Sequence, residues 1–258
     1  MVFVEICVDS FQSAVNAAEG GADRLELCAG LSVGGLTPSH GLIRRVVEAV
    51  DCPTVVLLRP REGDFVYSAA EEQVIFEDAR YAVEAGARGL VVGSLSLLGF
   101  VDCKFLRQLQ RDHLIKGAGL TFHRAFDFVA DQKDALDQLA AHGVIRVLTS
   151  GGAATALQGS EQIAGLVSHA RQHLAGFTVM AGGGIRPDNV DSILAHTGVS
   201  EIHSSACRLV ESKPVWRAHR PTVQLGAAGL DALSWRVADV STVADIRRAA
   251  DAASLHSS

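Results

Sequence analysis

The chain has 258 residues, a net charge of −6, a pI near 5.9 and an apolar fraction of 48%. This acidic balance leaves no basic stripe, so we predict that nucleic acid is not a partner. No apolar run reaches the roughly 18 residues of a membrane span, so we expect no membrane partner. The first residues form a strand pattern instead of a basic leader, and the five cysteines form no CxxC pair. We therefore expect a cytoplasmic protein with reduced thiols.

Eight short apolar segments alternate along the chain with segments of helical pattern. The predicted strands are 3–8, 24–27, 54–58, 89–92, 119–122, 145–148, 177–180 and 201–203. The predicted helices are 11–19 capped by Ser10, 38–50 with Pro38 in its first turn, 69–84, 102–112, 132–141 capped by Asp131, 161–173, 187–195 and 243–252. The connections between them are short, which is typical of repeated strand–helix units.

This alternation predicts one α/β domain over residues 1–258. Strands that alternate with helices form a parallel sheet covered by helices, and eight such units close into a (β/α)8 TIM barrel. A doubly wound open sheet is the alternative, because periodicity alone does not show closure. Residues 208–238 lack a regular pattern and form an expected excursion before the final helix.

Ionisable side chains gather at the ends of the predicted strands. Because side chains alternate with period two along a strand, parity groups these polar residues on one face of several strands and leaves the other face apolar. The candidate catalytic residues at the barrel mouth are Glu5, Glu26, Arg59, His123 and His203, with Asp127 in the turn after His123. Barrel enzymes assemble their sites at these strand ends. The alternative is a structural ion network in which Arg59 neutralises Glu5 and Glu26.

Glycine-rich turns follow the sixth and seventh predicted strands. Backbone N–H groups in such turns bind phosphate or carboxylate at the mouth of many barrels. The candidate anion-binding residues are Gly182, Gly183, Gly184 and Ile185 after the seventh strand, and Ser150 and Gly151 after the sixth. The alternative is that both segments are only tight connections.

Cys7 and Cys28 are placed by strand parity in the same compartment on neighbouring strands. Soft thiolates suit Cu(I), so this pair is the candidate metal site. Buried free cysteine also occurs as a small apolar residue, which is the alternative. No closed four-ligand spacing favours zinc.

Several long motifs resemble the CutC copper-homeostasis family, in the same order and at matching intervals. They are EICVDS, GGADRLELCAGLSVGGLTPS, RPREGDFVYS, TFHRAFD, RVLTSGG, AGGGIRPDN and EIHSSA, and together they cover nearly the whole chain. The resemblance implies a TIM barrel, a cytoplasmic location, homo-oligomers (dimers or tetramers) and copper handling. It also implies that Cys7 and Cys28 match the cysteines proposed as Cu(I) ligands in the family. Residues 215–230 depart from the family pattern.

Two functions remain open from the sequence. The first is a cytoplasmic copper-homeostasis protein that binds copper(I), the only cofactor we expect, and the family resemblance favours it. The second is an enzyme of isomerase, lyase or hydrolase type that acts on a small anionic substrate by acid–base chemistry at the barrel mouth. The enzyme hypothesis accounts for more of the polar residues, because Cu(I) binding requires few carboxylates and no arginine.

Overall fold

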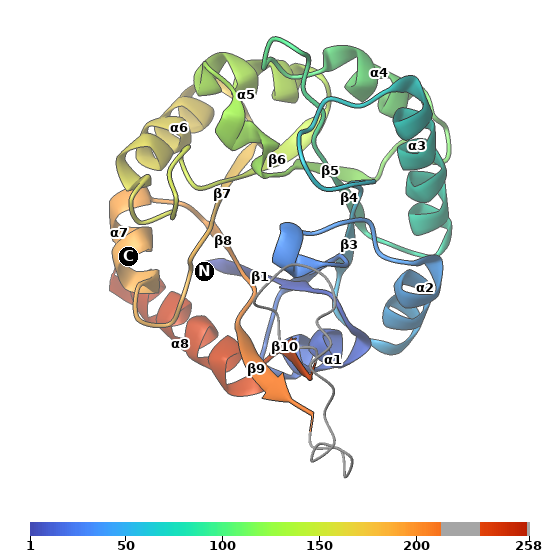
Figure 1. Ribbon diagram of the computed structural model, residues 1–258. Helices are drawn as coiled ribbons and strands as arrows, with labels where there is room; N and C mark the ends of the chain where they lie inside the picture. Colours follow the sequence, from blue (N-terminus) through green and yellow to red (C-terminus); the bar gives the residue numbers. More distant parts are fainter. Residues whose placement is uncertain (213–232, 257–258) are drawn as a thin grey trace.

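The protein is a closed barrel of eight parallel strands surrounded by helices, as Figure 1 shows. The computed structural model describes residues 1–212 and 233–256. The strands are β1 (Phe3–Val8), β2 (Arg24–Leu27), β3 (Thr54–Leu57), β4 (Gly89–Val92), β5 (Gly119–Phe122), β6 (Val144–Thr149), β7 (Thr178–Gly182) and β8 (Glu201–Ser204). β1 pairs in parallel with both β2 and β8, which closes the sheet. The predicted TIM barrel is confirmed, and the open-sheet alternative is wrong.

Helices follow the strands in the predicted order and begin at recognisable caps. They are α1 (Phe11–Glu19), α2 (His40–Ala49), α3 (Ala69–Glu84), α4 (Cys103–Arg111), α5 (Gln132–Ala141), α6 (Ser160–His173), α7 (Val190–Thr197) and α8 (Val240–His256), with short 3-10 helices η1 (Leu31–Val33) and η2 (Arg124–Phe128). Ser10 and Asp131 cap α1 and α5 as predicted. Pro38 lies outside its helix, because Ser39 is the N-cap of α2. α8 begins earlier than predicted because the Asp239 carboxylate accepts a hydrogen bond from Thr242 N.

Strand parity separates an apolar outer layer from a barrel interior that holds buried charged groups beside a smaller apolar cluster of Val55, Leu57 and Val91. Val4, Ile6 and Val8 of β1 are fully buried in the main hydrophobic core, which packs the sheet against the helices. Glu5 and Cys7 occupy the opposite face of the same strand and are buried as well. Burial of apolar area stabilises the outer layer at roughly 25 cal/mol per Å². The interior needs paired charges to be stable.

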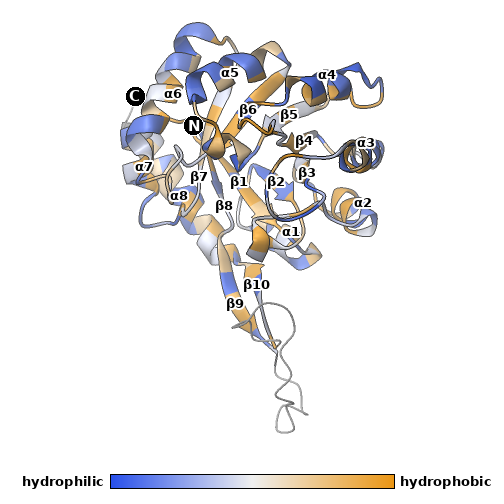
Figure 2. Ribbon diagram, turned by 45° about the horizontal axis from the view of Figure 1, so that its top comes forward, coloured by the Kyte–Doolittle hydropathy of each residue, from blue (hydrophilic) through white to orange (hydrophobic). Residues whose placement is uncertain are grey.

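An antiparallel hairpin follows the barrel. β9 (Cys207–Glu211) pairs with β10 (Ser234–Ala238) and projects away from the barrel (Figure 2). The prediction of an irregular excursion over 208–238 is therefore wrong at both ends, where cross-strand hydrogen bonds form. Residues 213–232 lie outside the described part, and with them the predicted departure from the family pattern at 215–230. None of the described helices is long and apolar enough to cross a membrane.

Candidate functional site

A cavity of about 900 Å³ opens at the mouth of the barrel where the strands end. Four of the six predicted catalytic residues line it, namely Glu26, Arg59, His123 and His203. Glu5 is 1% exposed and lies within the barrel beside His203. Asp127 is not among the residues that line the cavity. The structure thus brings most of the predicted set to one place.

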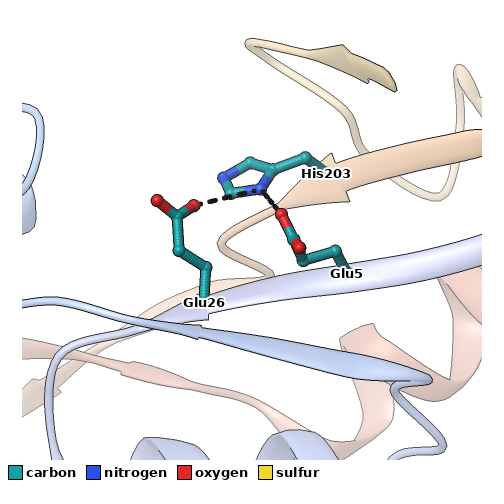
Figure 3. A group of neighbouring side chains, drawn as sticks. All are labelled: Glu5, Glu26 and His203. Atoms are coloured by element: carbon teal, nitrogen blue, oxygen red, sulfur yellow. Dashed lines mark hydrogen bonds and ion pairs between the residues drawn. The ribbon is translucent and has the colours of Figure 1, made fainter. Parts of the chain in front are cut away.

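Glu5, Glu26 and His203 form a compact cluster inside the barrel (Figure 3). The Nδ1 atom of His203 lies 2.7 Å from Glu5 Oε1 and 3.3 Å from Glu26 Oε2. Parallel registers place Glu5 beside His203 of β8 and beside Arg24 of β2. The Arg24 guanidinium forms an ion pair with Glu5 and another, at 2.6 Å, with Glu201. The structural ion network predicted from the sequence therefore uses Arg24 in place of Arg59.

The two carboxyl groups of the cluster have opposite protonation behaviour. Burial alone would raise the pKa of Glu5, but the hydrogen bond from His203 and the Arg24 charge lower it to about 2. Burial raises the pKa of Glu26 to about 7, and the Glu5 charge adds to the rise, while the charges of His203 and Arg24 offset only part of it. Burial opposes the charging of His203, yet the pKa of His203 is raised by Cys7, Glu26 and the hydrogen bond to Glu5. Glu26 is therefore the carboxyl group that exchanges a proton near neutral pH.

The cluster has the composition of a metal site. Ligand atoms of Glu5, Glu26 and His203 all lie within 4.8 Å of one another, and this is the one such group found among residues 1–212 and 233–256. Because the pKa of His203 is raised, its Nδ1 atom carries a proton toward both carboxylates, and this proton competes with a cation for them. Arg24 also neutralises Glu5. The charges of the cluster are thus compensated within the protein.

His123 enters the cavity as a neutral imidazole with a fixed tautomer. Its Nδ1 atom accepts a hydrogen bond of 3.0 Å from Ala125 N, so the ring proton is on Nε2. Burial, with the charge of Arg59, lowers the pKa of His123 to about 3. The Nε2 atom is buried and has no hydrogen-bond partner among the described residues. His123 therefore offers one unused N–H donor.

Gly93 at the end of β4 makes room for this ring. A Cβ atom built on Gly93 would lie 2.0 Å from Cε1 and 2.4 Å from Nδ1 of His123. Any side chain at position 93 would displace the imidazole.

Arg59 holds two loops of the cavity wall. Its Nη1 atom donates to Val33 O at 2.8 Å and to Gly35 O at 2.9 Å, and its Nη2 atom donates to Gly63 O at 3.1 Å. Its Nε atom is buried without a partner among the described residues. The predicted pairing of Arg59 with Glu5 and Glu26 is wrong, because backbone carbonyls of the loops take up the guanidinium.

The backbone N–H groups of the glycine turn after β6 bind a side-chain carboxylate of the same chain. The Asp127 carboxylate accepts hydrogen bonds from Ser150 N at 3.0 Å and from Gly152 N at 3.2 Å. Gly151 N donates to Thr149 Oγ1 at 2.8 Å. The predicted ligand-binding role of Ser150 and Gly151 is therefore corrected, since their N–H groups are engaged. Asp127, predicted as catalytic, anchors this turn.

The turn after β7 differs, because Gly183, Gly184 and Ile185 line the cavity. Gly182 belongs to β7, and a Cβ atom there would lie 2.5 Å from Leu148 Cδ1, so its role is close packing. The cavity lining contains more arginines than carboxyl groups. The carboxyl groups are those of Glu26 and Asp188, and the arginines are Arg59, Arg124, Arg186 and Arg236. Arg124, Arg186 and Arg236 were not predicted as site residues from the sequence. The position of Arg124 could have predicted its role, since it directly follows His123 at a strand end.

Cys7 and Cys28 both line the cavity, as strand parity predicted. Burial raises the pKa of both thiols. The Cys28 thiol donates to Val8 O at 3.5 Å. Two neighbouring thiols fit the soft-ligand chemistry of Cu(I), but they must lose their protons to bind it. As ligands they would hold the ion and supply no acid–base chemistry.

A family model described as the CutC family matches residues 2–208. The chain belongs to the CutC family. This assignment confirms the resemblance seen in the sequence motifs, and the matched span contains all eight barrel strands and every site residue predicted from the sequence.

Relatives and solved structures agree with the family and the fold. A human protein named copper homeostasis protein cutC homolog is 43% identical over 241 residues, which are 93% of this chain and 86% of the human protein. A CutC family protein of Xanthomonas campestris is 45% identical over 206 residues, 79% of this chain and 82% of the relative.

The crystal structure of the putative copper homeostasis protein CutC from Streptococcus agalactiae has a TM-score of 0.74 and 32% identity, covering 80% of this chain and 99% of that chain. The phosphoribosylanthranilate isomerase of Pyrococcus furiosus shares the fold alone. Its TM-score is 0.54 and its sequence identity 16%, over 98% of this chain and 100% of the isomerase.

Proposed function

We propose that this CutC family member is an enzyme that moves a proton on a small anionic carbonyl compound. One observation carries the proposal: a carboxyl group with a pKa of about 7 and a neutral imidazole with a pKa of about 3 line the same cavity. Paired titratable groups whose pKa values are driven apart are typical of acid–base sites. The arginines of the cavity wall favour an anionic substrate.

The chemistry assigns a separate role to each group. Glu26, when ionised, takes a proton from the carbon next to the substrate carbonyl. The C–H electron pair forms a carbon–carbon double bond, and the π pair of the carbonyl moves to its oxygen. The Nε2–H of His123 donates a hydrogen bond to that oxygen, which stabilises its growing negative charge. Glu26 then returns a proton to the same carbon, which restores the carbonyl compound, or to the oxygen, which gives the enol. His203 and Glu5 do not move the substrate proton in this scheme but set the proton affinity of Glu26.

Solvent exchange tests the proposal without knowledge of the product. The protein is incubated in D2O with sugar phosphates and 2-oxo acids, and deuterium incorporation at carbon is followed by NMR. Glu26→Gln and His123→Ala are expected to lower exchange by at least ~100-fold, the size of typical general acid–base contributions. The exposed Glu19→Gln variant is the charge control. Exchange that persists in Glu26→Gln at the rate of the parent refutes the role of Glu26.

Copper(I) binding is a second candidate function, supported by the two thiols on neighbouring strands that line the cavity. The human relative carries copper homeostasis in its name. An anaerobic competition assay is expected to give one Cu(I) per chain in the parent and none in the Cys7→Ser, Cys28→Ser double variant. Because both thiols have raised pKa values, affinity should rise with pH. Equal stoichiometry in variant and parent refutes this function.

We also propose a cytoplasmic location, supported by five free cysteines in the described structure. The homo-oligomer, a dimer or tetramer, stays a prediction, and light scattering of the purified chain measures it.

A further inference from the structure

The turn after β7 presents backbone N–H groups that have no acceptor in the described part of the chain. The carbonyl of Gly183 accepts a hydrogen bond of 2.9 Å from Ala156 N, and the carbonyl of Gly184 accepts one of 2.8 Å from Asn189 Nδ2. In a trans peptide, the C=O of one residue and the N–H of the next point in opposite directions. The N–H groups of Gly184 and Ile185 therefore point away from those partners, and both residues line the cavity.

Asn189 fixes the turn in this orientation. Besides its donation to Gly184 O, its Oδ1 atom accepts a hydrogen bond of 2.9 Å from Arg186 N. Gly183 and Gly184 have φ values of 103° and 75°, in the region that favours glycine. The side-chain amide of Asn189 thus holds the free N–H groups in place before any ligand arrives.

Arg124 places a guanidinium beside the same turn. Its Nε atom donates to Asp127 at 2.8 Å and its Nη2 atom to Ser150 Oγ at 2.7 Å. A Cβ atom built on Gly183 would lie 3.6 Å from the Cζ and Nη1 atoms of Arg124. The Nη1 group has no acceptor in the described structure, and the side chain is 43% exposed. Asp127 and Ser150 therefore orient a charged donor toward Gly183.

We infer that this turn is the binding site for the phosphate group of a phosphate monoester, held by the N–H groups of Gly184 and Ile185 and by Arg124. The inference deepens the proposed function, because it names the anionic group of the substrate. Two adjacent peptide donors and a guanidinium converge from different directions, which suits the terminal oxygens of a phosphate better than a planar carboxylate. In the same cavity, Arg59 and His123 are 7% and 6% exposed, and each has a buried N–H without a described partner. These groups would receive the rest of the ligand.

Isothermal titration with inorganic phosphate tests the site, with acetate as the carboxylate probe. The parent is expected to bind one phosphate per chain and to bind acetate more weakly. Arg124→Gln should weaken phosphate binding by about 10- to 100-fold, the size of one charge-assisted hydrogen bond. The matched control is Arg44→Gln on the outer surface of α2, where Arg44 pairs only with Glu48 among the described residues, and it should bind as the parent does.

Asn189→Ala is the second variant, because it removes both side-chain bonds that fix the turn while leaving every proposed ligand group present. It should also weaken phosphate binding, with circular dichroism unchanged. The inference is overturned if the parent does not bind phosphate, if acetate binds as tightly, or if Arg124→Gln binds like Arg44→Gln. The titration measures binding without turnover, so its failure leaves proton transfer on a carboxylate substrate standing. Loss of the exchange activity alone leaves this binding site standing.

Discussion

Replacing Glu26 by glutamine should make the stability of the protein less sensitive to pH. Glu26 is 5% exposed, and burial raises its pKa from 4.5 to about 7 in the folded state. Between these two pH values the folded state binds a proton that the unfolded state has already lost. Stability must therefore fall as pH rises across this interval. The contribution of protonated Glu26 is fully present below about pH 4.5 and is lost above about pH 7.

The size of this effect follows from the pKa difference. One pKa unit corresponds to about 1.4 kcal/mol, so the rise from 4.5 to about 7 corresponds to roughly 3 kcal/mol of unfolding free energy. Glutamine has nearly the same shape as a protonated carboxyl group and does not titrate. The Glu26→Gln variant should therefore gain stability relative to the parent by up to ~3 kcal/mol between pH 4.5 and pH 8.

Urea unfolding of parent and variant at closely spaced pH values measures this difference directly. The Glu26 charge also raises the pKa of His203, so the attraction between these two groups belongs to the same titration. The diagnostic quantity is therefore the change with pH of the stability difference between parent and variant. Glu19→Gln, on an exposed position of α1, is the charge control. A parent-to-variant difference that stays constant from pH 4.5 to pH 8 would refute a raised pKa, and with it Glu26 as a proton carrier near neutral pH.

Three further predictions concern neighbouring groups. Gly93→Ala should displace the His123 ring, because the added Cβ would lie 2.0 Å from Cε1, and should cost about 1–3 kcal/mol of stability together with the exchange activity; an unchanged melting temperature with full activity contradicts it. Arg59→Ala should destabilise the fold by about 3 kcal/mol, because three loop carbonyls lose their donor; a chemical denaturation midpoint equal to that of the parent contradicts the loop-holding role. Glu5→Gln should lower the free energy of unfolding by about 3–5 kcal/mol, because the buried Arg24 loses an ionised partner. Chemical denaturation at pH 7 measures this loss, and an effect below ~1 kcal/mol contradicts a structural ion pair.

Much of the fold could be predicted from local patterns. Strands β1, β2, β4 and β5 begin and end at the predicted residues, because apolar residues recur at alternate positions of each short segment. The hairpin of β9 and β10 could not be predicted from local patterns. Its two strands are partly exposed, and each pairs with a strand that lies far along the sequence.

The roles of the arginines were not predictable from sequence alone. Strand parity placed Arg59 and Arg24 on inward faces, but it could not determine which carboxylates each would reach. Arg24 reaches Glu5 because the β1–β2 register sets these two residues side by side. Arg59 lies beyond the end of β3, where loop carbonyls are nearer than any carboxylate. Similarly, two glycine turns looked alike in sequence, and only one is filled by the chain's own Asp127.

The sequence by itself determined the alternation of eight strands with helices and the strand ends at which the polar groups lie, because period-two alternation and helical periodicity are properties of neighbouring residues. Only the tertiary structure decided which of those groups meet and in what protonation state. Glu5 and His203 are 198 positions apart, and the closing of β1 against β8 brings them within 2.7 Å. The burial that results raises the pKa of Glu26 and lowers that of His123, and burial depends on every strand of the closed sheet.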